Sequence, residues 1–193
     1  MQQSYTRRNT NRIPQHNYAE PGYYFITICT ENRRQLFGTI ENDKIILNDI
    51  GNMVDVWWQK IFERYQNILI DEYIIMPNHI HGIINNVGAG FPRPKSFYGD
   101  NDINNKINGH GNRAPTIGNI IAYFKYQSTK QINKTQNNPG IKVWQRNFYD
   151  HIIRNDKSLN KIREYIINNP ATWNNDIENP NRTGNIELKS IQV

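Results

Sequence analysis

Two strand-like segments separated by Met76, Pro77 and Asn78 constrain the fold of this chain more than any other feature of its sequence. The segment NILIDEYIIM (67–76) is followed by Pro77 and Asn78 and then by HIHGIINN (79–86). Proline fixes φ and asparagine tolerates turn geometry, so this pattern predicts an antiparallel hairpin. The fold is therefore expected to contain a sheet in which these two strands are neighbours.

Two further segments are predicted to be strands. GYYFITICT (22–30) is rich in aromatic and β-branched residues, with apolar side chains at both alternating sets of positions. Because both of its faces could be covered, it is predicted to be a central strand. GIKVWQRNFY (140–149) is predicted to supply a fourth strand and a turn.

Three helices are predicted from apolar residues spaced three and four positions apart behind capping residues. They begin at Asn48 or Asp49, after Thr116, and near Asn155 or Asp156. The third helix must end at Asn169, because Pro170 disfavours helical geometry in the residue before it.

The order of these elements, β-α-β-β-α-β-α, predicts an α+β fold. Its expected form is a ferredoxin-like or RNA-recognition-like split βαβ antiparallel sheet with helices on one face, plus an added C-terminal helix that carries Tyr165. We expect one domain over residues 22–170, with a basic arm at 1–21, a long loop at 87–115 and a tail at 171–193. Many unrelated functions share this architecture, so function must be inferred from the site.

Composition narrows the classes of partner. The chain of 193 residues has 23 Lys and Arg against 17 Asp and Glu, a net charge of +6, which suits a polyanionic partner. Its single cysteine, Cys29, excludes an intramolecular disulfide and a cysteine-based zinc site. No secretion signal core or membrane-length apolar run is visible, so a soluble cytoplasmic protein with no membrane partner is expected.

His79 and His81 are the residues of the hairpin that most suggest chemistry. In a strand, residues two apart point to the same face about 6–7 Å from each other, so two imidazoles could meet one metal ion. The alternative is a pair of ordinary surface or hydrogen-bonded core histidines. On the last predicted helix, Tyr165 and Asn169 share one face, and Tyr165 lies at the edge of the apolar stripe. It could face a groove or be a core aromatic residue.

Several segments together carry a resemblance to a known family. They are YYFITICTENRRQLFG, LNDIG, IIMPNHIHGII, IIAYFKYQSTKQIN, VWQRNFYDHIIRN and IREYIINNP, in that order. Over roughly residues 4–173 the chain resembles the HUH-type single-tyrosine transposases, in particular their REP-associated tyrosine transposase branch. The resemblance implies that His79 and His81 bind a divalent metal, that Tyr165 is the nucleophile, and that Asn169 lies near the metal.

The function implied by the resemblance is a metal-dependent single-stranded DNA endonuclease and strand transferase. It would form a 5′-phosphotyrosine intermediate at sites associated with DNA hairpins, with Mg²⁺ or Mn²⁺ as cofactor and a homodimer as one possible assembly. The chemistry is consistent, because a tyrosine ester keeps the phosphoryl group available for later attack by a 3′-hydroxyl. A metal would serve as Lewis acid and template.

Charged residues supply further candidates. Possible DNA contacts are Arg7, Arg8, Arg12, Arg33, Arg34, Lys125, Lys130 and Arg154. His151 or Asp150 is a candidate for supporting the metal site from behind its ligands, and Arg154 is the possible phosphate contact in this stretch. A solvated charged face, or a capping and salt-bridge cluster beside the last helix, explains the same residues without a function.

Two other functions stay open from the sequence. One is a non-catalytic nucleic-acid-binding module of the same fold, although HIHGIINN lacks the aromatic residues that RNA-recognition domains place on a central strand. The other is metal-dependent hydrolysis of a small phosphoester, which would not depend on Tyr165.

Overall fold

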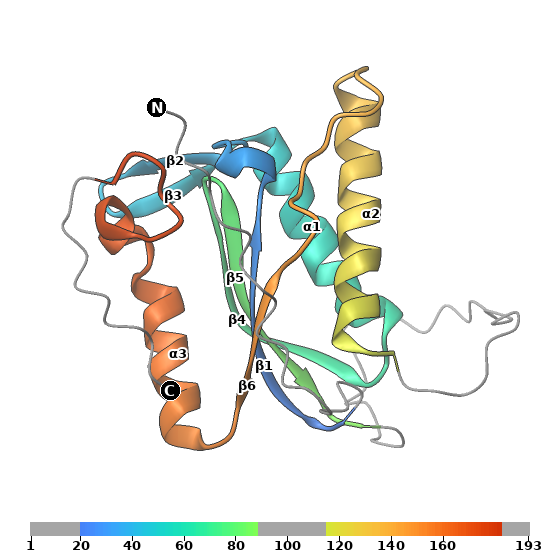
Figure 1. Ribbon diagram of the computed structural model, residues 1–193, viewed down its shortest axis with the longest axis vertical. Coiled ribbons are helices and arrows are strands. Elements are labelled where there is room, and N and C mark those ends of the chain that lie inside the picture. Colours follow the sequence, from blue (N-terminus) through green and yellow to red (C-terminus); the bar gives the residue numbers. More distant parts are fainter. Residues whose placement is uncertain (1–19, 89–114, 183–193) are drawn as a thin grey trace, which may run out of the picture.

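The computed structural model describes residues 20–88 and 115–182 (Figure 1). Most of the predicted N-terminal arm and of the predicted long loop, and the end of the predicted tail, lie outside these residues. Arg7, Arg8 and Arg12 are among the residues outside the described ranges.

Four antiparallel strands form the central sheet in the order β4-β5-β1-β6. The strands are β1 (Gly22–Cys29), β4 (Ile68–Met76), β5 (His79–Asn86) and β6 (Tyr149–Ile153). The hairpin is confirmed, because β4 pairs with β5 and Met76 stands opposite His79 across the turn. The central position of the first strand is also confirmed, since β1 pairs with β5 on one side and β6 on the other.

The three predicted helices are present with the predicted caps. They are α1 (Asp49–Arg64), α2 (Ile117–Thr135) and α3 (Asp156–Asn168). The side chains of Asn48, Thr116 and Asn155 each accept a hydrogen bond from a backbone N–H in the first turn of their helix. In Figure 1 the sheet stands between α3 on one side and α1 with α2 on the other. The added C-terminal helix therefore covers the face of the sheet that the other two helices leave open.

A second, two-stranded sheet was not predicted. It consists of β2 (Gly38–Glu41) and β3 (Lys44–Leu47), joined by Asn42 and Asp43, whose φ angles are +50° and +61°. Positive φ at both central residues is the geometry of a tight hairpin turn that asparagine and aspartate tolerate. Strands of four residues are too short for their alternation to stand out from a polar loop in the sequence.

The predicted position of the fourth strand was wrong. Residues 140–148 form no strand; their one sheet-like contact is an isolated bridge between Trp144 and Thr30. The segment looked like a strand because Val143 and Trp144 are buried. Backbone hydrogen bonds to the end of β1 hold it as irregular chain, and the fourth strand, β6, begins only at Tyr149.

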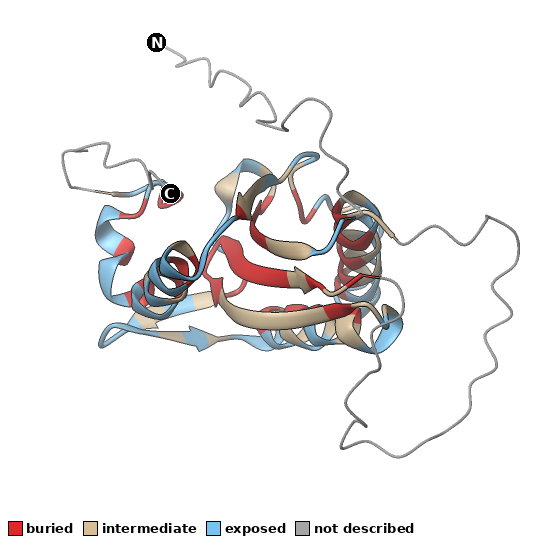
Figure 2. Cartoon of the chain, turned by 90° about the horizontal axis from the view of Figure 1, so that it is seen from below, coloured by how far each residue is buried: buried red, intermediate tan, exposed pale blue. Residues whose placement is uncertain are grey.

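Two clusters of buried side chains hold the layers together. Between the sheet and α1 and α2 lies a large apolar cluster that includes Tyr24, Ile80, Trp58 and Phe124. Between the sheet and α3 lies a smaller cluster: Phe25, Ile83, Ile153, Leu159, Ile162 and Ile166. Figure 2 shows burial concentrated in the interior strands and on the helix sides that face them. Among the described helices, none is both long and apolar enough to cross a membrane.

Candidate active site

His79 and His81 lie on the α3 face of the central strand β5. Opposite them on β1 stand Cys29 and Thr27, respectively. Both imidazoles are buried, and their ring centroids are 4.4 Å apart. The predicted side-by-side arrangement of the two histidines is thus present, in the interior of the protein rather than on its surface.

Hydrogen bonds fix how the His79 ring is oriented. Its Nδ1 lies 2.8 Å from Oδ1 of Asn78, an atom that can only accept, so Nδ1 carries the proton. The amide group of Asn78 is itself held, because its Nδ2 donates to the carbonyl oxygens of Arg33 and Glu178. The Nε2 atom of His79 is left with a free lone pair, and within the described residues it has no hydrogen-bond partner.

The His81 ring contacts two hydroxyl groups. Its Nδ1 lies 2.9 Å from Oγ1 of Thr27, and its Nε2 lies 3.1 Å from the hydroxyl oxygen of Tyr165. Nδ1–H donating to Thr27 leaves Nε2 as the acceptor for the tyrosine hydroxyl. This contact brings together two residues that are 84 positions apart in the sequence.

Burial keeps both imidazoles neutral. Loss of hydration, together with the nearby charge of Arg33, lowers the pKa of His79 to about 3. The pKa of His81 is also lowered, first by burial and then by His79. At neutral pH each ring therefore offers a nitrogen lone pair, which is the form that binds a metal.

Tyr165 reaches this pair from α3. Its ring packs edge-on against Phe25, with centroids 6.2 Å apart. Burial raises the pKa of its hydroxyl, and the carboxylates of Asp176 and Glu178 raise it further. The hydroxyl is therefore protonated at neutral pH, and it cannot act as a nucleophile until its proton is withdrawn or its negative charge is balanced.

An ion pair anchors the tyrosine helix to the sheet of its own chain. The guanidinium group of Arg163, two residues before Tyr165, donates to both carboxylate oxygens of Asp71 at 2.7 and 2.6 Å. This interaction also lowers the pKa of Asp71. Asp71 lies where the pairing of β4 with β5 is irregular, between Ile70 and Tyr73. The irregular register and the ion pair together hold α3 over the face that carries the histidines.

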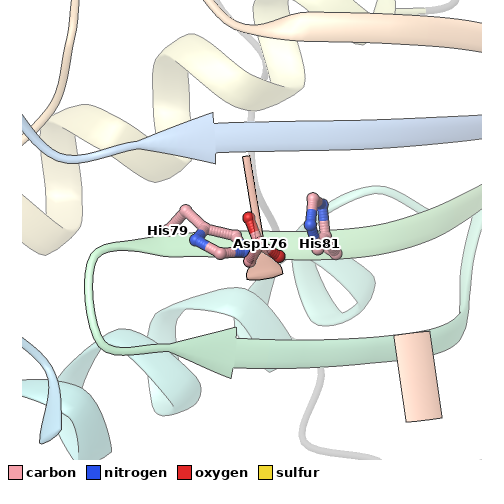
Figure 3. Close-up of side chains that lie close together, drawn as sticks. All are labelled: His79, His81 and Asp176. Carbon is pink, nitrogen blue, oxygen red and sulfur yellow. The ribbon is translucent and has the colours of Figure 1, made fainter. Parts of the chain in front are cut away.

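Asp176 is a site residue that the sequence analysis missed. It follows the 3-10 helix η2 (Pro170–Asn175), in the segment expected to be a polar tail. The ligand atoms of His79, His81 and Asp176 all lie within 4.8 Å of one another, as Figure 3 illustrates. Among the many asparagines after Pro170, only the nearby Trp173 could have signalled that this segment is buried.

Asn169 is buried beside this group. Its Nδ2 donates to Oδ2 of Asp176 at 2.9 Å, while its Oδ1 has no hydrogen-bond partner within the described residues. The site thus offers four possible ligands: two imidazole nitrogens, a carboxylate and an amide oxygen. Such a set of donor atoms fits a divalent cation such as Mn²⁺ or Mg²⁺. The residues present are therefore chemically suited to the metal that the resemblance implies.

The predicted DNA-contact residues are dispersed. Arg33 pairs with Glu178 at 2.9 Å and donates to the carbonyl of Ile177. Arg34 donates to the carbonyl of Lys142, and the ammonium group of Lys125 contacts the carbonyls of residues 145 and 147. Lys130 and Arg154 are exposed. Of these five, only Arg33 borders the histidine pair, and DNA contact by any of them stays a prediction.

Asp150 and His151 lie on opposite faces of the edge strand β6. Asp150 is paired with Ile26 and His151 with Phe25, and neighbouring residues of a strand alternate in direction. His151 is thus on the α3 face with the two histidines, one row away from His81. Asp150 is on the α1 and α2 face, so of the two alternatives His151 is the one on the side of the metal site, and its supporting role stays a prediction.

Comparison with known proteins identifies relatives along most of the chain. No protein-family model matches. An uncharacterized protein of Haemophilus influenzae is 39% identical over 173 residues, covering 88% of this chain and 91% of the relative. A second protein of that organism, named "Putative REP-associated tyrosine transposase", is 27% identical over 165 residues, covering 80% and 73%. The solved structure of a REP-associated tyrosine transposase bound to a REP hairpin is similar at a TM-score of 0.49 and 18% identity, covering 82% and 72%.

Proposed function

We propose that this chain, which is similar to a protein named as a REP-associated tyrosine transposase, is a transposase of that family and cleaves and rejoins single-stranded DNA through a covalent bond to Tyr165. The observation that carries this proposal is the 3.1 Å contact between the Tyr165 hydroxyl and Nε2 of His81, beside Nε2 of His79, which has no hydrogen-bond partner among residues 20–88 and 115–182. A nucleophile and a set of metal-binding atoms at one buried place are what phosphoryl transfer to a protein side chain requires.

The proposed cleavage step is a transesterification. The hydroxyl oxygen of Tyr165 attacks the scissile phosphorus, and the bond from phosphorus to the 3′-oxygen breaks. The tyrosine proton ends on that 3′-oxygen, which leaves as a hydroxyl, while the 5′-phosphate stays esterified to Tyr165. Rejoining is the reverse reaction with a 3′-hydroxyl as attacking group, so neither direction consumes water or an energy source.

His79 and His81 would hold the divalent cation. The resemblance implies that Asn169 would be a third ligand. When bound, the cation would act as a Lewis acid on the phosphate and offset its developing charge. The Nε2 lone pair of His81 can serve only one partner at a time. When it serves as a ligand, the Tyr165 hydroxyl must leave it and becomes available to the substrate.

The substrate proposed is a single strand that carries a hairpin, as the resemblance implies. The test incubates the purified chain and Mn²⁺ with labelled single-stranded oligonucleotides copied from DNA flanking its gene. We expect a denaturant-resistant adduct that is absent in Tyr165→Phe and His79→Ala. Tyr126→Phe is the matched control, because Tyr126 is 63% exposed on α2.

Two results would contradict the proposal. DNA binding without an adduct across these substrates would favour a non-catalytic binding module. Metal-dependent hydrolysis of a small phosphoester that persists in Tyr165→Phe would favour a phosphoesterase.

We further propose that Tyr165 acts with the histidines of its own chain, since the Arg163–Asp71 ion pair fastens α3 to the same sheet. Mixing inactive Tyr165→Phe with inactive His79→Ala tests this directly. No activity should return from the mixture, whereas recovery of adduct formation would indicate sites shared between subunits of a dimer.

A further inference from the structure

Asp176 is a buried carboxylate whose charge is not balanced by a cationic side chain. It is 7% exposed. Its Oδ2 accepts from Nδ2 of Asn169 and its Oδ1 from the backbone N–H of Glu178, and within the described ranges it forms no ion pair. Burying a carboxylate without a cation is costly even when its hydrogen bonds are made. Such a group indicates that a positive charge belongs beside it.

Glu178, the neighbouring buried acid, shows the contrast. Its carboxylate pairs with the guanidinium of Arg33 at 2.9 Å and accepts from the thiol of Cys29 at 3.3 Å. Two acids of similar burial, two residues apart, therefore differ in that only Glu178 has a cation from the protein.

The two imidazoles next to Asp176 supply the second observation. Nε2 of His79 is fully buried, holds a lone pair, and has no partner in the described part of the chain. Figure 3 shows the Asp176 side chain between the imidazoles of His79 and His81. The ligand atoms of the three residues lie within 4.8 Å of one another. A metal ion would satisfy the lone pair and balance the carboxylate at once.

We infer that Asp176 is the anionic ligand of the metal site, and that Asn169 orients it by donating to its Oδ2. This inference rests on the proposed function, because it concerns the same metal. An oxygen anion beside two neutral nitrogens gives the site the ligand character that Mn²⁺ and Mg²⁺ accept.

The position of Asp176 in the chain would couple metal binding to the helix that carries Tyr165. Asp176 stands at the end of η2, which begins at Pro170 directly after the tyrosine helix, and Trp173 of η2 packs near His79 with ring centroids 6.0 Å apart. A metal held by β5 and by Asp176 would connect the central strand to the segment that follows Tyr165. Metal binding would then also fix the end of the helix that carries the nucleophile.

The test measures Mn²⁺ binding by calorimetry near neutral pH, with no DNA present. Asp176→Asn keeps the shape and an acceptor for the Glu178 N–H but loses the charge, and we expect its affinity to fall at least about tenfold. Glu178→Gln, the matched control, removes a neighbouring buried charge that is already paired with Arg33, and we expect a smaller change. Asp176→Asn without metal should be no less stable to heat than the parent chain, yet lose most of the Tm increase that Mn²⁺ gives.

The outcomes separate this inference from the proposed function. If the parent chain binds no Mn²⁺, the proposed metal site itself is wrong. If it binds, and His79→Ala abolishes binding while Asp176→Asn binds like the parent, only the role of Asp176 is overturned.

A measurement on the unaltered protein covers the case in which Asp176→Asn does not fold. In a Mg²⁺ titration followed by amide NMR, the Glu178 N–H should shift together with the amides of His79 and His81, because it donates to the proposed ligand. Shifts at the histidines with none at Glu178 would overturn the inference.

Discussion

The two faces of the central sheet differ in what they bury. The face under α1 and α2 is filled by aliphatic and aromatic side chains such as Ile80, Trp58 and Phe124. The face under α3 has a smaller apolar cluster and, beside it, buried polar groups that include His79, His81 and Asn169. Since β5 contributes to both faces, alternation along one strand separates the residues that stabilise the fold from those suited to chemistry.

Buried polar atoms without a hydrogen-bond partner occur on both sides of the sheet within the described residues. Most buried polar groups in proteins are hydrogen-bonded, so exceptions indicate a missing partner or a strained site. In the part of the chain that the structure describes, the exceptions on the α3 face are Nε2 of His79 and Oδ1 of Asn169, both near the proposed metal position. The α1 and α2 side also holds buried polar atoms without a hydrogen-bond partner, Nε1 of Trp58 and Oδ1 of Asn133, so what distinguishes the two on the α3 face is their position beside Asp176.

Trp58→Ala is expected to have the largest effect, and it tests whether side chains of the apolar face contribute to stability but not to adduct formation. Trp58 is fully buried among the rings of Tyr73 and Phe124, so its truncation is expected to lower the free energy of unfolding by about 3–5 kcal/mol. Urea denaturation measures the loss. Adduct formation per folded molecule should remain near the parent value, and a large decrease there would break the division between the two faces.

Acidification should destabilise the α3 face selectively in the metal-free protein. The pKa of each site histidine is lowered on folding, so the unfolded chain binds more protons and stability falls as pH drops below about 6.5 towards about 3. Between pH 6.5 and 5 each histidine is expected to cost about 2 kcal/mol.

Urea denaturation in the presence of a chelator, at several pH values, checks this dependence. His79→Gln lacks one of the two titrating groups and should lose part of the slope. An unchanged slope in that variant would mean that other groups cause the acid sensitivity.

Gly82→Ala tests how sharply the faces are separated, because Gly82 adjoins His81 in the chain. An added Cβ would lie 2.5 Å from Cζ2 of Trp58 on the α1 and α2 face. We expect overpacking to cost about 1–3 kcal/mol of stability, with Mn²⁺ affinity almost unchanged. Thermal denaturation and calorimetry give the two quantities, and a parallel loss of metal affinity would show that the faces are coupled.

Arg163→Lys should have the smallest effect on stability, and it tests the positioning of Tyr165. Lysine keeps the charge but cannot make two parallel hydrogen bonds to Asp71. The pair is partly exposed, so we expect roughly 1 kcal/mol or less in stability, together with a several-fold slower adduct formation. Lys161→Gln on the exposed side of α3 is the control, and equal rates in the two variants would argue against a positioning role for the ion pair.

Elements with strong local patterns were predictable from the sequence. The hairpin of β4 and β5, the strand β1 and the capped helices follow from alternation, apolar spacing and capping residues. The β2–β3 hairpin is too short to show a pattern, and the position of β6 was obscured by the buried Val143 and Trp144 before it. Which face of the sheet α3 covers depends on long-range packing. The spacing of apolar residues within the helix does not indicate that face.

The same distinction applies to the site. Strand spacing indicated that His79 and His81 lie together, and the resemblance drew attention to Tyr165 and Asn169. Asp176 was missed because a short 3-10 helix has little periodicity, and one aspartate among many asparagines carries no local signal. Thr27 and Asn78, which orient the two imidazoles, become recognisable only once the strand register and the turn are known.

The eight-residue register between β1 and β5 makes the site sensitive to changes of chain length. One residue added to or lost from the start of β5 would turn Ile80 towards α3 and the histidines into the apolar core, since side chains alternate at every position. A point substitution there harms one contact, whereas the insertion or deletion of a single codon would exchange the apolar and the metal-binding faces of β5. Over generations, we therefore expect length variants to survive in loops and to be eliminated between Pro77 and Asn86.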